Sequence, residues 1–96
     1  MEVRLNSTLR GLSGKRSLVL DLPEGGTVRD ALAETVAQLP VLDGKLLVGE
    51  ELVPTVVVFL NGRNIHFHEG LNTVVQPDQT LDIFPRTGAQ RAFVRD

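Results

Sequence analysis

Two histidines, His66 and His68, are the side chains of this sequence best suited to binding a metal ion. One residue separates them, so on a β-strand both imidazoles would face the same side. Two imidazoles are too few ligands for a tight site, Glu69 is too close along the chain to complete the geometry easily, and the chain has no cysteine. We therefore predict two solvent-facing strand residues and no metal site.

Residue types that bind phosphate or act as nucleophiles are present, but not in a catalytic arrangement. Gly25-Gly26 precedes a predicted helix, yet neither a Lys-Ser/Thr pair nor a longer glycine spacing accompanies it, so a tight strand-to-helix turn explains the pair better. Ser7, Ser13 and Ser17 lack convincing histidine and carboxylate partners. The sequence therefore indicates a protein that is not an enzyme and binds no cofactor of its own.

Composition narrows the class of partner. The chain of 96 residues has the size of one domain, and its net charge of −2 gives no strongly basic face for a nucleic acid. Without Trp or Tyr, and with four Phe, a platform for stacked bases is not expected. The longest apolar run, residues 56–60, is too short to span a bilayer, and the sequence begins directly on a strand pattern. We expect a cytoplasmic protein that binds neither nucleic acid nor membrane.

Apolar periodicity over the first 40 residues predicts a hairpin and a helix. Residues 1–9 and 17–22 alternate as strands, with a turn over residues 11–15 between them. Thr27 and Asp30 have the spacing of a capping box, and apolar residues then recur at helical spacing until Pro40. The helix presents one apolar stripe that needs a sheet to cover it.

The second half of the chain predicts further strands. Residues 41–54 are rich in loops, with Leu42, Leu46 and Leu47 under the domain edge. Residues 56–60 are apolar on both faces, which favours an interior strand, and Asn61-Gly62 favours a tight turn. A short return strand at 65–68 and a last strand at 80–84 follow. This order predicts an α+β fold over residues 1–85, in which a mixed sheet of four to five strands wraps one main helix. Residues 86–96 lose periodicity and are interpreted as a flexible C-terminal tail.

A series of short segments covers nearly all of residues 1–85. They are Val3-Arg4-Leu5, Thr8-Leu9-Arg10-Gly11-Leu12-Ser13-Gly14-Lys15, Asp21-Leu22-Pro23-Glu24-Gly25-Gly26-Thr27-Val28-Arg29-Asp30-Ala31-Leu32, Leu39-Pro40-Val41-Leu42, Val57-Val58-Phe59-Leu60-Asn61-Gly62-Arg63-Asn64-Ile65, Glu69-Gly70-Leu71-Asn72-Thr73 and Leu81-Asp82-Ile83-Phe84-Pro85. In this order and spacing they resemble the MoaD/ThiS family, the sulphur carriers of molybdopterin and thiamine synthesis. The resemblance implies a ubiquitin-like β-grasp fold.

The resemblance also implies a chemistry for the C-terminus. An adenylating partner of such carriers uses ATP to activate the last glycine of a Gly-Gly pair. In this chain Ala89 and Gln90 fall where the paired glycines would lie, and the sequence runs on to Asp96. A terminal aspartate places an extra carboxylate beside the reacting one, so Asp96 is predicted to be a poor substrate. Trimming after Gly88 would expose a glycine terminus.

The resemblance further implies which residues meet a partner, either an adenylating enzyme or the large subunit of a synthase. They are Asn6, Phe84, Pro85, Arg86, Thr87 and Gly88. Two of these positions depart from the family pattern. Arg86 takes the place of a second proline, and Asn6 stands where family members often carry an aromatic or apolar residue.

Three functions remain open at this point: a carrier that is active only after trimming, an interaction module that has lost carrier chemistry, and a protein modifier attached after processing. An interaction module would bind a protein through its sheet face, its tail or a second copy of the chain. The tail carries Arg86, Arg91 and Arg95 around the apolar pair Phe93-Val94. It is either a segment that docks on an acidic groove or adds an edge strand, or a solvated terminus.

Overall fold

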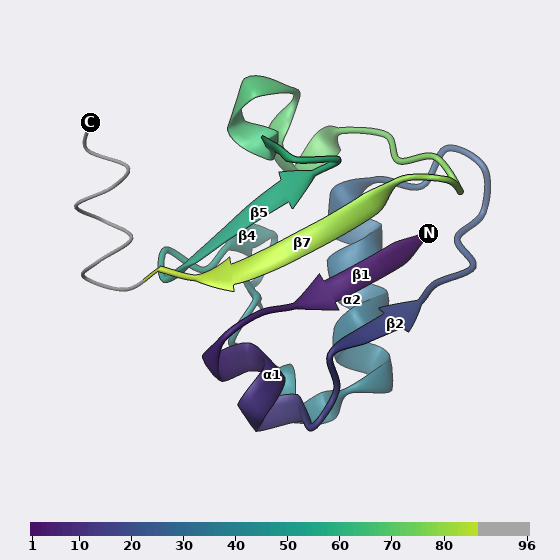
Figure 1. Ribbon diagram of the computed structural model, residues 1–96. Helices are drawn as coiled ribbons and strands as arrows, with labels where there is room; N and C mark the ends of the chain where they lie inside the picture. Colours follow the sequence, from purple (N-terminus) through teal and green to yellow (C-terminus); the bar gives the residue numbers. More distant parts are fainter. Residues whose placement is uncertain (87–96) are drawn as a thin grey trace.

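In the computed structural model, which describes residues 1–86, one helix crosses a five-stranded sheet (Figure 1). The strands follow the spatial order β2-β1-β7-β5-β6. They comprise β1 (Glu2–Leu5), β2 (Ser17–Val19), β5 (Val56–Leu60), β6 (Arg63–Asn64) and β7 (Thr80–Pro85). The pair β1–β7 is parallel and the other neighbours are antiparallel, so the sheet is mixed, as predicted.

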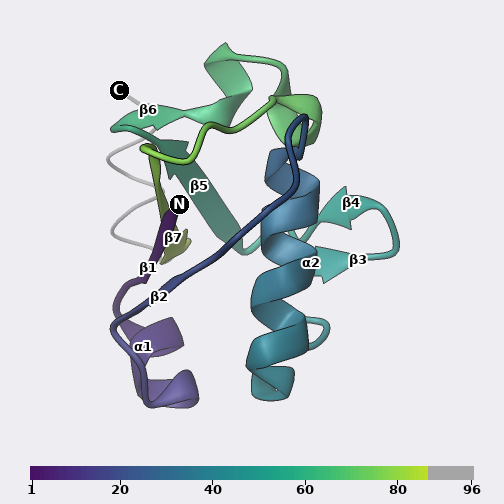
Figure 2. The same ribbon diagram turned by 90° about the vertical axis from the view of Figure 1, so that its right-hand side faces the viewer.

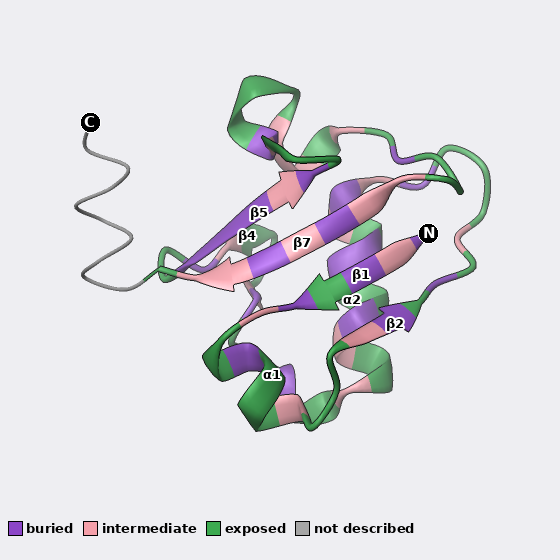
Figure 3. Cartoon of the chain, in the orientation of Figure 1, coloured by how far each residue is buried: buried purple, intermediate pink, exposed green. Residues whose placement is uncertain are grey.

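The core lies between this sheet and helix α2 (Val28–Gln38), which covers one face of it (Figure 2). Alternation along the strands turns every second side chain toward the helix. Leu5 of β1, Leu81 and Ile83 of β7, and Leu32 of α2 are all fully buried. The resulting bands of buried and half-buried residues run along β7 in Figure 3. The central strand is therefore fixed by the core on one face.

The start of α2 confirms the predicted capping box. The Thr27 hydroxyl accepts a hydrogen bond from the Asp30 backbone N–H at 3.3 Å, and the Asp30 carboxylate accepts one from the Thr27 backbone N–H at 2.9 Å. Two N–H groups that a helix start leaves without partners are thereby satisfied. The helix ends before Pro40, which begins the 3₁₀ turn Pro40–Leu42.

The N-terminal hairpin exists, but its connection is wrong in the sequence prediction. Strand β1 ends at Leu5, and helix α1 (Thr8–Ser13) replaces the predicted extended residues 8–9 and the turn at 11–15. Ser7, with φ of 57°, breaks the strand, and Gly14, with φ of 73°, ends the helix by donating its N–H to the Arg10 carbonyl at 2.9 Å. The predicted strand at 17–22 is shortened to β2.

Two further differences lie in the second half. The predicted return strand at 65–68 is wrong: the chain returns in β6 and then forms the 3₁₀ turn Ile65–Phe67. A second 3₁₀ turn, Gly70–Asn72, follows. The loop at 41–54 contains a small hairpin of β3 (Leu47–Val48) and β4 (Glu51–Leu52), on the side of α2 away from the main sheet (Figure 2). Leu42 and Leu46 are fully buried beneath it, as predicted.

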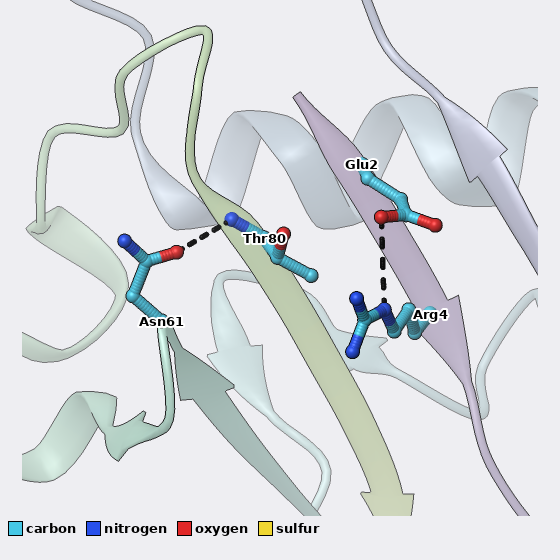
Figure 4. Close-up of polar contacts among 4 residues, drawn as sticks. All are labelled: Glu2, Arg4, Asn61 and Thr80. Atoms are coloured by element: carbon cyan, nitrogen blue, oxygen red, sulfur yellow. Dashed lines mark hydrogen bonds and ion pairs between the residues drawn. The ribbon is translucent and has the colours of Figure 1, made fainter.

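The turn at Asn61-Gly62 is confirmed, with φ of 50° and 84°. Its asparagine also reaches the first residue of β7. The Asn61 side-chain oxygen accepts a hydrogen bond from the Thr80 N–H at 2.8 Å (Figure 4), and the Asn61 N–H donates to the Thr80 carbonyl at 2.8 Å. The turn therefore fixes where the central strand begins.

Candidate functional site

The face of the five-stranded sheet turned away from α2 is not covered by a helix in the described part of the chain, and we call it the outer face. Pairing places alternate residues of neighbouring strands side by side on it. Arg4 of β1 lies beside Asp82 of β7, and Phe84 of β7 lies beside Val57 of β5. The side of the outer face at β1 is therefore charged, and the side at β5 is apolar.

The apolar end is formed by Val57, Phe59 and Phe84, which we call the outer apolar cluster. Val57 is only 8% exposed although it does not belong to the core between sheet and helix. The rings of Phe59 and Phe84 meet edge to face, with centroids 5.7 Å apart and planes at 81°. Residues 56–60 are thus apolar at every position because β5 packs on both faces. The sequence shows that two-sided pattern and predicts an interior strand, but no pattern in it marks Val57 or Phe59 as site residues.

The end of β7, from which the tail leaves, is held from both sides. On one side the Asn6 backbone N–H and side-chain amide both donate to the Ile83 carbonyl, each at 3.1 Å. On the other side the Arg86 N–H donates to the Thr55 carbonyl. We call this region, comprising Asn6, Phe84, Pro85 and Arg86, the tail root. The half-buried Asn6 amide is hydrogen bonded there, so its burial leaves no unpaired donor at that contact.

The structure thus brings together four of the six residues that the sequence predicted to meet a partner. Phe84 belongs both to the tail root and to the outer apolar cluster, whereas Thr87 and Gly88 lie outside the described residues. The same holds for Arg91, Arg95, Phe93 and Val94 of the predicted tail segment.

The sequence predicts that both histidines are solvent-facing residues of a strand; the strand placement is wrong, and the exposure to solvent is confirmed. His66 lies within the 3₁₀ turn Ile65–Phe67 and meets the Phe67 ring edge to face at 5.6 Å, while His68 ends the turn. Both are exposed. Within residues 1–86 no three side chains of His, Cys, Asp or Glu gather as a metal site would require.

Gly25-Gly26 forms the tight turn that the sequence favoured. Gly25 has φ of 86°, and a Cβ at residue 26 would come within 3.1 Å of the Pro23 carbonyl oxygen. The Gly26 carbonyl accepts a hydrogen bond from the Val75 N–H at 2.9 Å. The positive φ of Gly25 and the close Pro23 carbonyl at Gly26 therefore explain both glycines without a phosphate-binding role.

No helix in the part of the chain described here combines the length and the apolar character needed to cross a bilayer.

Comparison with known proteins places this geometry in a family context. The model of the ThiS family matches residues 3–88. Small archaeal modifier protein 3 of Haloferax volcanii is 29% identical over 85 residues, which cover 88% of this chain and 92% of that protein. The crystal structure of SAMP1 from Haloferax volcanii has a TM-score of 0.81 at 26% identity, covering 91% of this chain and 94% of that one. The solution structure of the Haloferax volcanii HVO 2177 protein has a TM-score of 0.79 at 29% identity, covering 91% and 82%.

Proposed function

The chain belongs to the ThiS family of ubiquitin-like proteins, and from that premise we propose that it is a carrier or modifier that reacts through the carboxylate of Gly88 after removal of residues 89–96. The observation that carries the proposal is the end of the family match. It stops at residue 88, and Gly88 is the only glycine after the last strand. This supports Gly88, in preference to the Ala89-Gln90 pair, as the counterpart of the family's reactive terminus.

The proposed reaction begins on a partner enzyme that binds ATP. A carboxylate oxygen of Gly88 attacks the α-phosphate, the bond to the β-phosphate breaks, and pyrophosphate leaves, which yields an acyl adenylate. A glycine suits this step because a terminus without a Cβ can enter a narrow nucleotide site. The chain itself supplies the carboxylate and the positioning, while the partner supplies the catalytic groups.

The tail root supports this role by giving the terminus a fixed origin. Arg86 is the last residue held by a backbone hydrogen bond among those described, and Gly88 follows two residues later. A partner that binds the outer apolar cluster contacts Phe84, which lies four residues before Gly88. Fully extended, four residues span at most about 14 Å. The residue that a docked partner contacts and the residue that reacts are therefore at most about 14 Å apart.

The untrimmed chain is a poor substrate in this proposal. Asp96 brings a second carboxylate into a site that already holds the phosphates, and the β-branched Val94 restricts the chain just before it. Removal of residues 89–96 eliminates both. The trimming protease and the adenylating enzyme are thus both protein partners, and the need for ATP places the activity in the cytoplasm.

The second reactant decides between the two activities. Attack of a sulfide donor on the acyl adenylate releases AMP and leaves a thiocarboxylate, which is the carrier reaction. Attack of a lysine amine releases AMP and leaves an isopeptide bond, which is the modifier reaction. Because one relative is a small archaeal modifier protein, we retain the modifier reaction as an alternative to the carrier reaction.

Intact-mass analysis of the protein expressed in its native host tests the proposal. A species that ends at Gly88, with or without one oxygen replaced by sulfur, supports it. A Gly88→Pro variant should yield neither the trimmed species nor a conjugate, whereas a Gly11→Ala variant, changed in helix α1 and not in the tail, should yield the same species as the wild type. Full-length protein ending at Asp96 under conditions that activate the pathway would favour the interaction module instead.

Defined termini separate trimming from activation. Chains of residues 1–87, 1–88 and 1–96 are compared in ATP–pyrophosphate exchange with an adenylating enzyme of the same organism. Exchange with the 1–88 chain alone is the expected result. Equal exchange with all three chains would exclude Gly88 as the reacting residue.

A further inference from the structure

A charged pocket opens beside the outer face on its β1–β2 side, whereas the outer apolar cluster lies on its β5–β7 side. It encloses about 230 Å³ and is lined by Glu2, Arg4, Leu5, Asn6, Arg10, Arg16 and Ser17. We call it the arginine pocket. Its three arginines come from three places in the chain: strand β1, helix α1 and the residue before β2. It shares Asn6 with the tail root, so the two sites adjoin.

Helix α1 creates the pocket. The chain leaves β1 after Leu5, turns through the helix and returns to the same strand end, where the Leu5 N–H donates to the Arg16 carbonyl at 2.9 Å. The Arg10 Nε donates to the Leu5 carbonyl at the long distance of 3.5 Å. Both arginines are therefore brought to the end of the strand that carries Arg4 on its outer face, and all three side chains are exposed.

The charge of the pocket is only partly balanced. Arg4 Nε lies 3.6 Å from a carboxylate oxygen of Glu2, and both side chains face solvent (Figure 4). This is the only ion pair among the side chains of residues 1–86, so neither Arg10 nor Arg16 has a carboxylate partner there. Asp82, the cross-strand neighbour of Arg4, does not pair with it and separates the pocket from Phe59. Two guanidinium groups thus stay available to an external anion.

We propose that the arginine pocket binds an acidic segment of the protein partner that activates or receives the C-terminus. The identity of that partner rests on the proposed function, but the presence of the binding surface does not. An acidic protein segment fits because the pocket is continuous with the tail root through Asn6 and with the outer face through Arg4. A partner that holds the tail passes next to it, and carboxylates suit the planar donors of arginine.

A nucleic acid fits the same surface less well. The rings nearest the pocket, Phe59 and Phe84, are half-buried against each other edge to face and offer no open platform to bases. Asp82 lies between Arg4 of the pocket and Phe59, and the chain as a whole carries a net charge of −2. Both repel a continuous phosphate backbone, whereas a short acidic segment needs only the pocket itself.

The test is an NMR titration of the ¹⁵N-labelled full-length chain with an acetylated and amidated octaglutamate peptide. Saturable shifts are expected at the amides of Asn6, Arg10 and Arg16, and they should weaken at high salt. Arg16→Glu should lower the affinity about fivefold or more, the effect of losing one exposed ion pair. Arg63→Glu is the matched control. It makes the same charge change at an exposed arginine outside the pocket, and it should leave the affinity unchanged.

Separate arms of the titration distinguish the ligands. Arg16→Gln repeats the test without a charge reversal, and a native-like spectrum shows that either variant is folded. Equal affinity of wild type and both Arg16 variants, or shifts that do not saturate, would overturn the proposal. So would inorganic phosphate or a thymidine 20-mer that shifts the same amides at lower concentration than the peptide. None of these results depends on whether the tail is trimmed at Gly88.

Discussion

Substitution of Asn61 separates two contributions to the stability of the turn between β5 and β6. The residue has φ of 50°, a conformation that disfavours side chains other than Asn, Asp and Gly. Its side-chain oxygen also accepts the hydrogen bond from Thr80 N–H at 2.8 Å. The left-handed conformation costs an alanine about 1 kcal/mol. The exposed hydrogen bond contributes about 1 kcal/mol to the free energy of unfolding.

Three variants of Asn61 separate the contribution of the left-handed conformation from that of the hydrogen bond. Asn61→Ala loses both, so we expect a decrease of about 2 kcal/mol in the free energy of unfolding, which lowers Tm by about 10 °C in a domain of this size. Asn61→Gly keeps the conformation and loses the acceptor, so the expected decrease is about 1 kcal/mol. Asn61→Asp keeps both and should stay within about 0.5 kcal/mol of wild type.

Urea unfolding followed by far-ultraviolet circular dichroism measures the three differences, since the chain has no Trp or Tyr for fluorescence. The dependence of the unfolding free energy on urea should be the same in all variants, because the surface exposed on unfolding does not change. Equal losses of unfolding free energy in Asn61→Ala and Asn61→Gly would refute the contribution of the left-handed conformation. A loss for aspartate as large as that for alanine would refute the role of the acceptor.

Four more changes test other parts of the fold. Gly14→Ala should lower the free energy of unfolding by about 1 kcal/mol because φ is 73°, although a Cβ there meets nothing within 4 Å. Gly11→Ala, also unobstructed but inside α1, should raise it by up to about 1 kcal/mol, and a loss there would contradict the helical assignment. Thr27→Ala breaks the capping box and should cost about 1 kcal/mol in thermal unfolding, which a fully stable variant would disprove. Phe84→Ala should cost about 2 kcal/mol and change the ring-proton shifts of Phe59 in NMR spectra; unchanged shifts would show that the two rings do not pack in solution.

Local signals account for the elements that the sequence predicts well. The spacing of Thr27 and Asp30 predicts both hydrogen bonds of the capping box, and the Asn61-Gly62 pair predicts a turn that few other residues tolerate. Each signal depends on contacts within four residues. The last strand is predicted by a local signal of the same kind. Alternation along it places Leu81 and Ile83 on one side, which the core covers.

Helix α1 could not be predicted in the same way, because its stability is not local. Six residues are too few to form a stable helix alone. The helix is held by the burial of Leu9, whose exposed fraction is 4%, while Leu12 remains 47% exposed. Residues 1–9 also alternate as a strand would, so the strand pattern continues past the point at which α1 begins. Ser7, the residue before the helix, has a positive φ, which is uncommon for serine, and its side chain makes no capping hydrogen bond.

The same limit applies to the candidate site. The tail root follows from the position of the last strand, so Phe84, Pro85 and Arg86 could be predicted once that strand was recognised. The arginine pocket could not, because it depends on α1. Residues 4, 10 and 16 are six apart, and in an extended hairpin Arg10 would lie near the tip, away from Arg4. Only the return of the chain to Leu5 brings them to one pocket.

The arrangement separates recognition from reaction. The outer apolar cluster and the arginine pocket are defined by residues within 1–86, whereas Gly88 lies outside the described residues. Removal of residues 89–96 would therefore change the reacting group without removing any of the surfaces argued to hold a partner. Under the proposed function, a partner would bind the untrimmed chain, but adenylation would still require the new terminus. The proposal therefore predicts that the trimming step, and not the docking step, makes the chain reactive.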